Sequence, residues 1–187
     1  MSLFENKRRW DALMHKEEVG TLLVLDEGNY TEDMLVVKKD SVRALIIRDG
    51  RIAVQRGMRG DCKLLGGGVE EGETFEDALV REVLEEGGLI VRTDTIRPLG
   101  RIEEKRRDIF EPDKVYVCHS YYYACDVEAE TVGTHMTESE LAKGYHLEWK
   151  KPKDIICDNA NFAKEPWIYR DTEFVKLLAV RQTTENK

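Results

Sequence analysis

The amino-acid sequence predicts an α+β fold in which helices pack on the faces of a β-sheet, as in an α/β/α sandwich. Runs of β-branched and aromatic residues indicate strands, and many of these runs are close enough in sequence to be joined as hairpins. Two or three stretches carry apolar residues at helical spacing. Strands and helices do not alternate regularly, so a doubly wound parallel sheet is not expected.

The chain is predicted to form one main domain with a small appendage. It has 187 residues, of which 41% are hydrophobic and 35% are charged, as is usual for a soluble globular chain. We expect an N-terminal extension over residues 1–40, packed on the core, a main domain over residues 41–182 and a disordered tail over residues 183–187.

The N-terminal extension is predicted to contain a helix and two strands. Residues 5–18 place Trp10, Leu13 and Met14 on a short amphipathic helix. Residues 20–37 are predicted to form two strands around a turn at residues 26–29.

The clearest hairpin lies at residues 42–57. β-branched runs stand on both sides of Asp49-Gly50, and this dipeptide is the strongest short-range signal for a two-residue hairpin turn. A short strand at residues 62–65 then leads into three consecutive glycines.

From Thr74 the apolar period changes to that of a helix, predicted over residues 74–86. Thr74 followed by Asp77 resembles a capping box, with Asp in place of the usual Glu or Gln. Gly87-Gly88 stands where a C-cap is expected. The apolar stripe of this helix consists of Phe75, Leu79 and Val83.

The second half of the chain is predicted to be rich in strands and to end in a helix. Strands are expected at residues 89–93, 98–103, 114–128 and 146–151. The stretch 104–113 is predicted to be a polar connection, 134–145 a loop or short helix, and 152–156 the start of a turn or helix. The C-terminal helix is expected over residues 170–181, with Phe174, Leu177, Leu178 and Arg181 at helical spacing.

Charge and composition exclude several functional classes. The formal net charge is −8, which disfavours non-specific binding to a nucleic-acid backbone. No apolar run approaches the roughly 20 residues that span a membrane. The first ten residues lack the apolar region of a signal peptide, so we expect a cytoplasmic protein without a membrane partner. The cysteines lack CxxC spacing and are expected to be reduced rather than bound to zinc: Cys62, Cys118, Cys125 and Cys157.

Three glutamates on the predicted helix form an acidic ridge beside its apolar stripe. Glu82 and Glu86 lie one turn apart, with Glu85 next to them. Like charges at this spacing destabilise a helix by a few tenths of a kcal/mol per pair, a cost that is offset if a cation lies between them. Hard carboxylate oxygens suit Mg²⁺ or Mn²⁺, which would also take substrate phosphates as ligands.

The glycines before the helix complete this pattern. Gly66-Gly67-Gly68 permits a tight turn, so that backbone carbonyls can reach a metal ion and a substrate can approach the main chain. Arg81 lies on the helix eight residues after Glu73, and a bidentate pair between them would fix the loop to the helix.

The stretch from Gly67 to Leu89 resembles the Nudix box, G-x5-E-x7-R-E-U-x-E-E-x-G-U, in which U is a bulky aliphatic residue. Every fixed position is filled: Gly67, Glu73, Arg81, Glu82, Val83, Glu85, Glu86, Gly88 and Leu89. The resemblance implies a Nudix-like α/β/α sandwich with a mixed β-sheet, and hydrolysis of a phosphoric anhydride with Mg²⁺ or Mn²⁺ as cofactor. The expected substrate is a nucleoside diphosphate linked to another moiety, as in a nucleoside triphosphate, a nucleotide sugar such as ADP-ribose, or a dinucleotide.

The resemblance also implies roles for individual residues. Glu82 and Glu86 would be the main metal ligands, Glu85 a ligand or a group that orients metal-bound water, and the Gly66 carbonyl a further ligand. Gly67, Glu73 and Arg81 would support the site structurally. The general base varies in this family, being either a helix glutamate or an acid on a later loop, for which Glu138 and Glu140 are the candidates.

Other interpretations stay open from the sequence alone. A non-catalytic module that senses a nucleotide or nucleotide sugar is the alternative to an enzyme, whereas a Ca²⁺-binding domain would need an Asp/Asn-rich loop that is not found. A homodimer formed through the predicted N-terminal hairpin is plausible. Several side chains are either structural or in contact with substrate: His119, His135, His146, Tyr121, Tyr122, Tyr123, Arg51, Arg56, Arg59 and Arg101.

Overall fold

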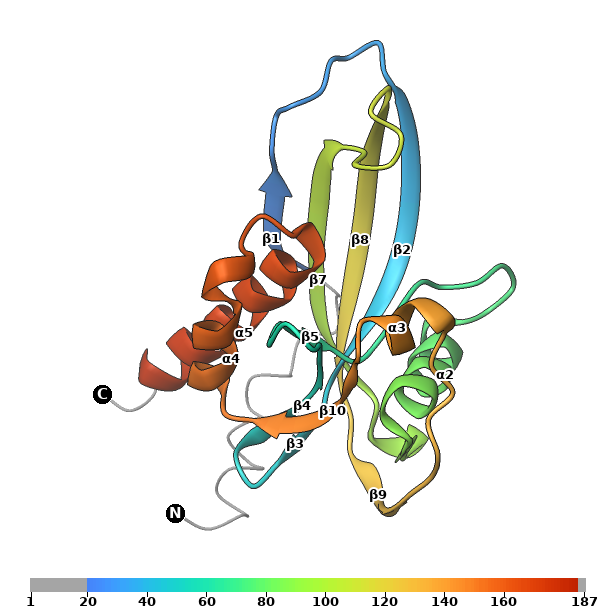
Figure 1. Cartoon of the computed structure of the whole chain (residues 1–187), viewed down its shortest axis with the longest axis vertical. Helices are drawn as coiled ribbons and strands as arrows, with labels where there is room; N and C mark the ends of the chain where they lie inside the picture. Colours follow the sequence, from blue (N-terminus) through green and yellow to red (C-terminus); the bar gives the residue numbers. More distant parts are fainter. Residues whose placement is uncertain (1–19, 185–187) are drawn as a thin grey trace.

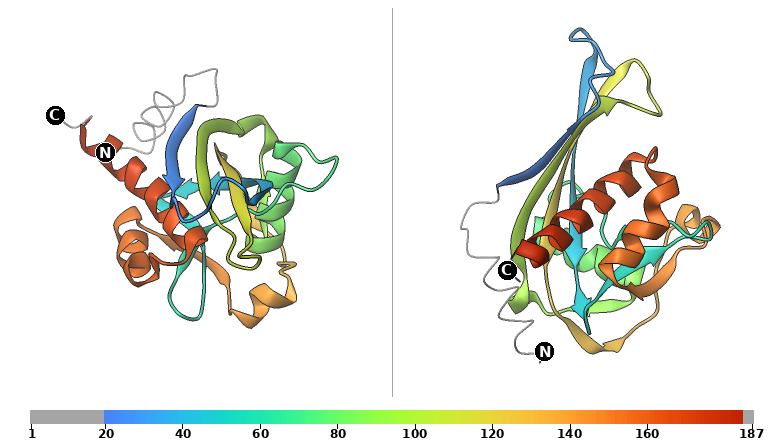
Figure 2. Two further views of the ribbon diagram at one scale, coloured as in Figure 1. Left: turned by 90° about the horizontal axis from the view of Figure 1, so that it is seen from above. Right: turned by 90° about the vertical axis from the view of Figure 1, so that its left-hand side faces the viewer.

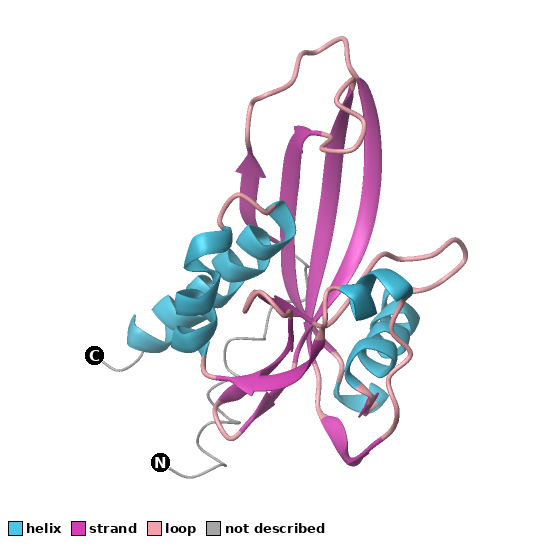
Figure 3. Cartoon of the chain, in the orientation of Figure 1, coloured by secondary structure: helices cyan, strands magenta, loops and turns pink. Residues whose placement is uncertain are grey.

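The computed structural model describes residues 20–184, with side chains as far as residue 179. The helix predicted at residues 5–18 therefore lies outside the described residues, as do residues 185–187. Figure 1 shows a tall β-sheet with helices on both sides of its lower half, and Figure 3 shows the same view coloured by secondary structure.

The central sheet is mixed. Its four strands, in order across the sheet, are β1 (Thr21–Asp26), β7 (Arg97–Arg107), β8 (Lys114–Ala124) and β2 (Leu35–Leu45). The pairs β1–β7 and β2–β8 are parallel, while β7–β8 is antiparallel.

Two smaller antiparallel sheets lie below it. One contains β10 (His146–Lys150), β4 (Arg51–Arg56) and β3 (Ile47–Arg48), with β5 (Cys62–Leu64) paired to β4. The other pairs β6 (Leu89–Val91) with β9 (Val127–Thr131).

The helices cover both faces of the sheet layer, as the two further views in Figure 2 also show. They are α2 (Phe75–Gly87), α3 (Glu138–Ala142), α4 (Pro152–Asp158) and α5 (Pro166–Thr184), with two 3-10 turns, η1 (Thr93–Thr95) and η2 (Asn159–Phe162). Successive residues of a strand point to opposite faces of a sheet. Accordingly, Val42 and Ala44 of β2 pack in the cluster that contains α2, while Leu45 packs in the cluster that contains α5. The predicted α/β/α sandwich with a mixed sheet is confirmed.

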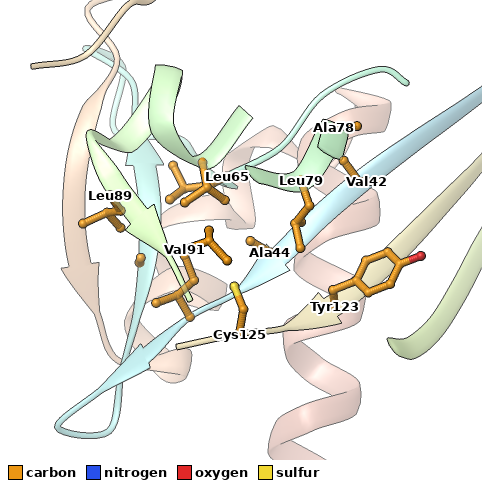
Figure 4. Close-up of a cluster of buried hydrophobic side chains, with 12 residues drawn as sticks. Val42, Ala44, Leu65, Ala78, Leu79, Leu89, Val91, Tyr123 and Cys125 are labelled. Carbon is orange, nitrogen blue, oxygen red and sulfur yellow. The ribbon is translucent and has the colours of Figure 1, made fainter. Parts of the chain in front are cut away.

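Two apolar clusters hold the layers together. The cluster under α2 joins the apolar stripe of that helix to β2, to Leu65 and to β6, with Leu79, Val83 and Leu89 fully buried (Figure 4). The cluster under α5 centres on Tyr122, whose ring stacks on Phe174 at 3.8 Å between centroids. Since both clusters use the same strands, the helices on the two faces are fixed relative to each other.

The N-terminal hairpin predicted over residues 20–37 is wrong. Both strands exist, but β1 and β2 lie at opposite edges of the sheet, with the β7–β8 hairpin between them. The segment that joins them, residues 27–34, crosses the end of the sheet and does not form the hairpin turn predicted at residues 26–29 (Figure 1). The basis on which a homodimer was expected is therefore absent from the described residues.

The other element predictions agree with the structure in most places. The hairpin at Asp49-Gly50 is confirmed, since both residues have positive φ, 51° and 71°, as a primed turn requires. The predicted polar connection at residues 104–113 is wrong in its first part, because β7 continues to Arg107. Helix α5 begins earlier than predicted and continues to Thr184, two residues into the expected tail.

Three further observations bear on the predicted organisation. Strand β2 crosses the expected boundary between residues 40 and 41. All four cysteines are free, as expected, and only Cys157 among them is exposed. In the part of the chain that the structure describes, no helix is long and apolar enough to cross a membrane.

Candidate active site

Helix α2 presents the acidic ridge, and its ends are fixed by its own sequence. The Thr74 hydroxyl accepts the Asp77 backbone N–H at the N-terminus, satisfying a donor that the helix leaves free. At the other end Gly88 takes a left-handed conformation, φ 60°, and its N–H bonds the Leu84 carbonyl. A Cβ at Gly88 would lie 2.2 Å from the Val132 carbonyl oxygen, so glycine is required there.

The three glycines form a bend between β2 and the ridge. The backbone N–H of Val42 donates to the Gly67 carbonyl oxygen at 2.9 Å. This hydrogen bond holds the bend beside β2. Gly66 has φ 137°, and a Cβ on it would lie 2.1 Å from the Val42 carbonyl oxygen. A Cβ on Gly67 would lie 2.3 Å from Oε1 of Glu82. At Gly66 the bend therefore approaches the strand more closely than any other residue type allows, and at Gly67 a side chain would displace the Glu82 carboxylate.

Arg81 fixes the bend to the helix. Its Nε and Nη2 donate to the two carboxylate oxygens of Glu73, at 2.8 and 3.0 Å, the bidentate pair that the sequence suggested. Nη2 also donates to the Gly68 carbonyl, and Nη1 donates to Oε1 of Glu82 at 2.8 Å. Accepting the hydrogen bonds of Arg81 lowers the pKa of Glu73, and donating them to Glu73 and Glu82 raises the pKa of Arg81 against the effect of burial.

Glu86 is buried at the centre of the site. Its side chain is 3% exposed, and Oε2 accepts the backbone N–H of Gly66 at 2.7 Å. Oε1 accepts the Lys63 ammonium at 2.8 Å, and the same ammonium reaches Oε1 of Glu140 at 3.4 Å. Lys63 thus joins a carboxylate of α2 to a carboxylate of α3.

The two carboxylates titrate in opposite directions. Burial raises the pKa of Glu86 to about 7, although Lys63 and the Gly66 N–H oppose this change. Burial also acts to raise the pKa of Glu140, but the Thr137 N–H, Glu86 and Lys63 outweigh it and bring that pKa to about 2. At neutral pH the pair therefore holds a proton on Glu86 for part of the time, while Glu140 is an anion.

The structure brings together most, but not all, of the candidate residues. Glu82, Glu86 and Glu140 lie around the bend with their cationic partners, and Glu85 lies at its edge, 41% exposed, with Nη1 of Arg81 at 3.4 Å from its carboxylate. Glu138 is exposed in the first turn of α3. Sequence reasoning missed Lys63, because a lysine between Cys62 and Leu64 looks like the outward residue of an ordinary strand.

The remaining candidates have structural partners. Tyr121 packs on Phe75 at 4.5 Å between centroids, and the buried hydroxyl of Tyr122 donates to Asp171. The Nδ1 atom of His119 lies 3.5 Å from a carboxylate oxygen of Asp40. Of the four arginines whose role the sequence left undecided, three form ion pairs: Arg56 with Asp158, Arg59 with Glu165 and Arg101 with Glu103. The fourth, Arg51, donates to the Trp149 carbonyl.

The donor set fits a divalent cation with hard-ligand preferences. Within residues 20–184, no three His, Cys, Asp or Glu side chains are arranged as a finished metal site. The carboxylates are instead paired with Arg81 and Lys63, which place positive charge beside Glu82 and Glu86. The glycine bend leaves space for no other side chain at that point, and carboxylate oxygens are the ligands that Mg²⁺ and Mn²⁺ prefer.

Comparisons with known proteins identify the family. The sequence matches the NUDIX domain family over residues 35–171. Comparison with curated proteins gives no significant sequence match.

The fold also resembles solved structures. A NUDIX hydrolase from Nitrosomonas europaea is 19% identical, with 66% of this chain and 79% of that chain covered and a TM-score of 0.52. The E. coli ORF135 protein is 22% identical, covering 81% of this chain and 94% of that chain, with a TM-score of 0.44. A MutT NUDIX hydrolase from Burkholderia pseudomallei is 24% identical, covering 63% and 86%, with a TM-score of 0.45.

Only the likeness to the Nitrosomonas europaea structure has a TM-score above 0.5 among these three, and at 19% identity it speaks for the fold alone. The family assignment rests on the sequence match and on the complete box. The chain therefore belongs to the NUDIX domain family and is a hydrolase that acts on a phosphoric anhydride.

Proposed function

We propose that the protein is a divalent-metal-dependent pyrophosphohydrolase that cleaves a nucleoside diphosphate linked to another moiety. The substrate would be a nucleoside triphosphate, a nucleotide sugar such as ADP-ribose, or a dinucleotide. Mg²⁺ or Mn²⁺ would be held by Glu82, Glu85 and Glu86 with the Gly66 carbonyl.

One observation carries this proposal: the acidic ridge of α2 meets the glycine bend at contact distance. The Gly66 N–H bonds Glu86, and a Cβ on Gly67 would overlap the Glu82 carboxylate. A diphosphate lying along the bend would contact backbone rather than side chains, with the carboxylates behind it. A diphosphate is repelled by the carboxylates around the bend, which belong to Glu82, Glu85, Glu86 and Glu140. Its binding there therefore requires a bridging cation.

Each residue around the bend has a separate task. Arg81 holds Glu82 and the Gly68 carbonyl, so that the ridge and the bend keep one geometry. When bound, a divalent ion lowers the pKa of coordinated water and neutralises charge on the phosphoryl oxygens. Lys63 keeps Glu86 and Glu140 close, at 2.8 and 3.4 Å from its ammonium.

Glu140 is the better of the two loop candidates for the general base. Its low pKa keeps Oε1 ionised at neutral pH, and Oε1 lies within the site. Glu138 precedes it by two residues on α3 but is exposed outside the site. We therefore propose that Glu140 accepts the proton of the attacking water, through Oε1.

The test is a hydrolysis screen with purified protein. ADP-ribose, nucleoside triphosphates and dinucleotides are incubated with Mg²⁺, with Mn²⁺ and with EDTA, and nucleotide and phosphate release are measured. We expect turnover of at least one class with either metal and none with EDTA.

Substitutions then locate the activity. Glu82→Gln and Glu86→Gln are expected to lower kcat by at least about 100-fold, since each removes a charged ligand of the metal. Glu76→Gln, an exposed position in the first turn of the same helix, is the matched control and should retain full turnover. Unchanged turnover in both ridge variants would overturn the metal assignment, and ligand recovered intact after incubation with Mg²⁺ would favour the sensor instead.

A further inference from the structure

A second charged cluster lies on the sheet face that α5 covers, outside the site described above. It consists of Arg43 on β2, Glu104 and Arg106 on β7, and Arg170 and Asp171 on α5, and we call it the arginine cluster. None of its members is more than 8% exposed. Charged side chains are rarely buried to this extent without partners that account for them.

Strand register brings these residues together. Glu104 pairs with Cys118, Arg106 with Tyr116, and Arg43 with Tyr122, so their side chains share the face opposite α2. Helix α5, which packs on this face, contributes Arg170 and Asp171. The stacking of Phe174 on Tyr122 holds the helix in place. The cluster is therefore fixed by both layers and does not depend on a loop.

The carboxylates of the cluster are fully engaged. Glu104 lies 2.6 Å from Nε of Arg106 and 3.8 Å from Nη1 of Arg170. Asp171 accepts the Tyr122 hydroxyl at 3.1 Å and the Leu64 N–H at 2.9 Å, and it also lies 3.2 Å from Nε of Arg170.

The guanidinium groups, by contrast, keep unmet donors. Nη2 of Arg170 and Nε of Arg43 are buried and have no hydrogen-bond partner. The distance of 3.7 Å from Nε of Arg43 to Asp171 is an ion-pair distance but too long for a hydrogen bond. Three guanidinium groups face two carboxylates, which leaves one positive charge in excess in a dry environment. Such a group costs considerable free energy unless an anion or water satisfies it.

The arginine cluster adjoins the glycine bend. The Leu64 N–H that bonds Asp171 lies two residues before Gly66. A Cβ on Gly66 would lie 3.0 Å from the Cα of Arg43. The backbone of β2 at Arg43 therefore lies beside the bend, while the Arg43 side chain points to the sheet face that α5 covers.

We propose that the arginine cluster is an anion-binding subsite, in which Arg43 and Arg170 bind a phosphate or carboxylate group. This inference does not rest on the proposed function. Arg106, whose donors go to Glu104 and to the Arg107 carbonyl, positions Glu104.

Anion binding is measured without a divalent ion, so that the catalytic site contributes least. The full-length protein in EDTA is titrated by calorimetry with inorganic phosphate and with acetate, at constant ionic strength maintained with a chloride salt. The variants are Arg170→Lys and Arg43→Lys, which keep the charge but remove the planar set of donors. Arg101→Lys is the matched control, because Arg101 pairs with Glu103 on the opposite face of the same sheet.

We expect saturable binding to the wild-type protein, about tenfold weaker in Arg170→Lys and in Arg43→Lys, and unchanged in Arg101→Lys. A preference for phosphate over acetate would identify the natural ligand as a phosphate group, and the reverse preference would identify it as a carboxylate. If Arg170→Lys fails to fold, Arg43→Lys alone decides. Absence of saturable binding, or equal affinity in all variants, would overturn the subsite.

Crystals soaked in bromide give an independent location. The inference requires anomalous density beside Nη2 of Arg170 and Nε of Arg43, and ordered water alone at both atoms contradicts it. Hydrolysis is assayed with the same preparations. Anion binding without hydrolysis would refute the proposed function and leave the subsite standing, whereas hydrolysis without anion binding would do the opposite.

Discussion

At the scale of single residues, the ridge glutamates differ most in their burial. The side chain of Glu86 is 3% exposed and that of Glu85 is 41% exposed, although both belong to one helical turn. Water stabilises the anion of Glu85, whereas Glu86 depends on Lys63 and the Gly66 N–H. This difference gives Glu86 a pKa of about 7, raised by burial above its ordinary value of 4.5.

The first prediction concerns the pH dependence of stability without metal. A carboxyl whose folded pKa is raised stabilises the fold fully below its unfolded pKa and loses that contribution as pH rises through the folded value. For Glu86 the loss falls between about pH 4.5 and 7. Urea unfolding is measured in EDTA at pH 5, 6, 7 and 8. Across this range the free energy of unfolding of the wild type should fall by roughly 2–3 kcal/mol relative to that of Glu86→Gln.

Subtracting the variant cancels the titration of the four histidines, which both proteins share. If the difference in free energy of unfolding between wild type and Glu86→Gln stays constant from pH 5 to 8, the raised pKa of Glu86 is contradicted. The same proton competes with a divalent ion, so the affinity for Mg²⁺ is expected to rise over this pH range.

The second prediction separates the two loop glutamates. Glu140→Gln is expected to lower kcat by about 10²–10⁴, the usual contribution of a general base, with little change in KM. Glu138→Gln, two residues away on the same helix but outside the site, should change kcat less than about twofold. Steady-state kinetics on the substrate found in the screen give both values. Equal losses in the two variants would remove Glu140 from its proposed role.

At the scale of elements, the glycine bend combines two separate steric requirements. Gly66 faces backbone, with a Cβ 2.1 Å from the Val42 carbonyl oxygen, and its φ of 137° disfavours any side chain. Gly67 faces the movable end of Glu82. Gly68 has nothing within 4 Å of an added Cβ.

The third prediction follows from the different surroundings of the three glycines. Gly66→Ala should destabilise the fold by about 2 kcal/mol or more, since a strained backbone residue alone costs 1–3 kcal/mol. Gly67→Ala should keep the fold but displace the Glu82 carboxylate, with a loss of metal affinity and activity. Gly68→Ala is the control and should match wild type in both respects. Urea unfolding and Mn²⁺ titration measure the two effects, and an active Gly67→Ala would show that Glu82 need not lie against the bend.

Elements set by neighbouring residues were predictable from the sequence. The Asp49-Gly50 turn, the Thr74 cap and the Gly88 C-cap depend on side chains a few positions apart, and all three were found. The acidic ridge was predictable for the same reason, since helical spacing fixes its geometry. The pair between Arg81 and Glu73, which lies in the loop before α2, was suggested by the residue types and is present in the structure.

Contacts between distant segments were not predictable. Whether β1 pairs with β2 or with β7 depends on which apolar faces meet, and the chain places β1 against β7. Lys63 enters the site only because β5 lies beside α2, and Glu104 is buried only because Arg106 and Arg170 meet it.

At the scale of the whole molecule, one strand couples the expected N-terminal extension to the main domain. Strand β2 runs without interruption from Leu35 to Leu45 and pairs with β8 throughout. The β1 residues Leu22, Leu23 and Leu25 pack against the apolar cluster under α5. The two segments share one sheet and one core, although the sequence suggested a boundary at residue 40.

The fourth prediction is that these segments unfold together. Thermal unfolding followed by far-UV circular dichroism and by tryptophan fluorescence should give a single coincident transition, as expected for one cooperative unit. Two separated transitions, with one removed by deleting residues 1–34, would show instead that the N-terminal segment is an independent unit.

The account as a whole depends on a divalent ion between the acidic ridge and the glycine bend. The most direct measurement is the anomalous density of Mn²⁺ in crystals soaked with manganese and a non-hydrolysable nucleotide. The account predicts a peak at about 2.0–2.3 Å from carboxylate oxygens of Glu82 and Glu86, with Lys63 displaced from Glu86. No peak at that position, with Lys63 and Arg81 still paired to the two glutamates, would contradict it.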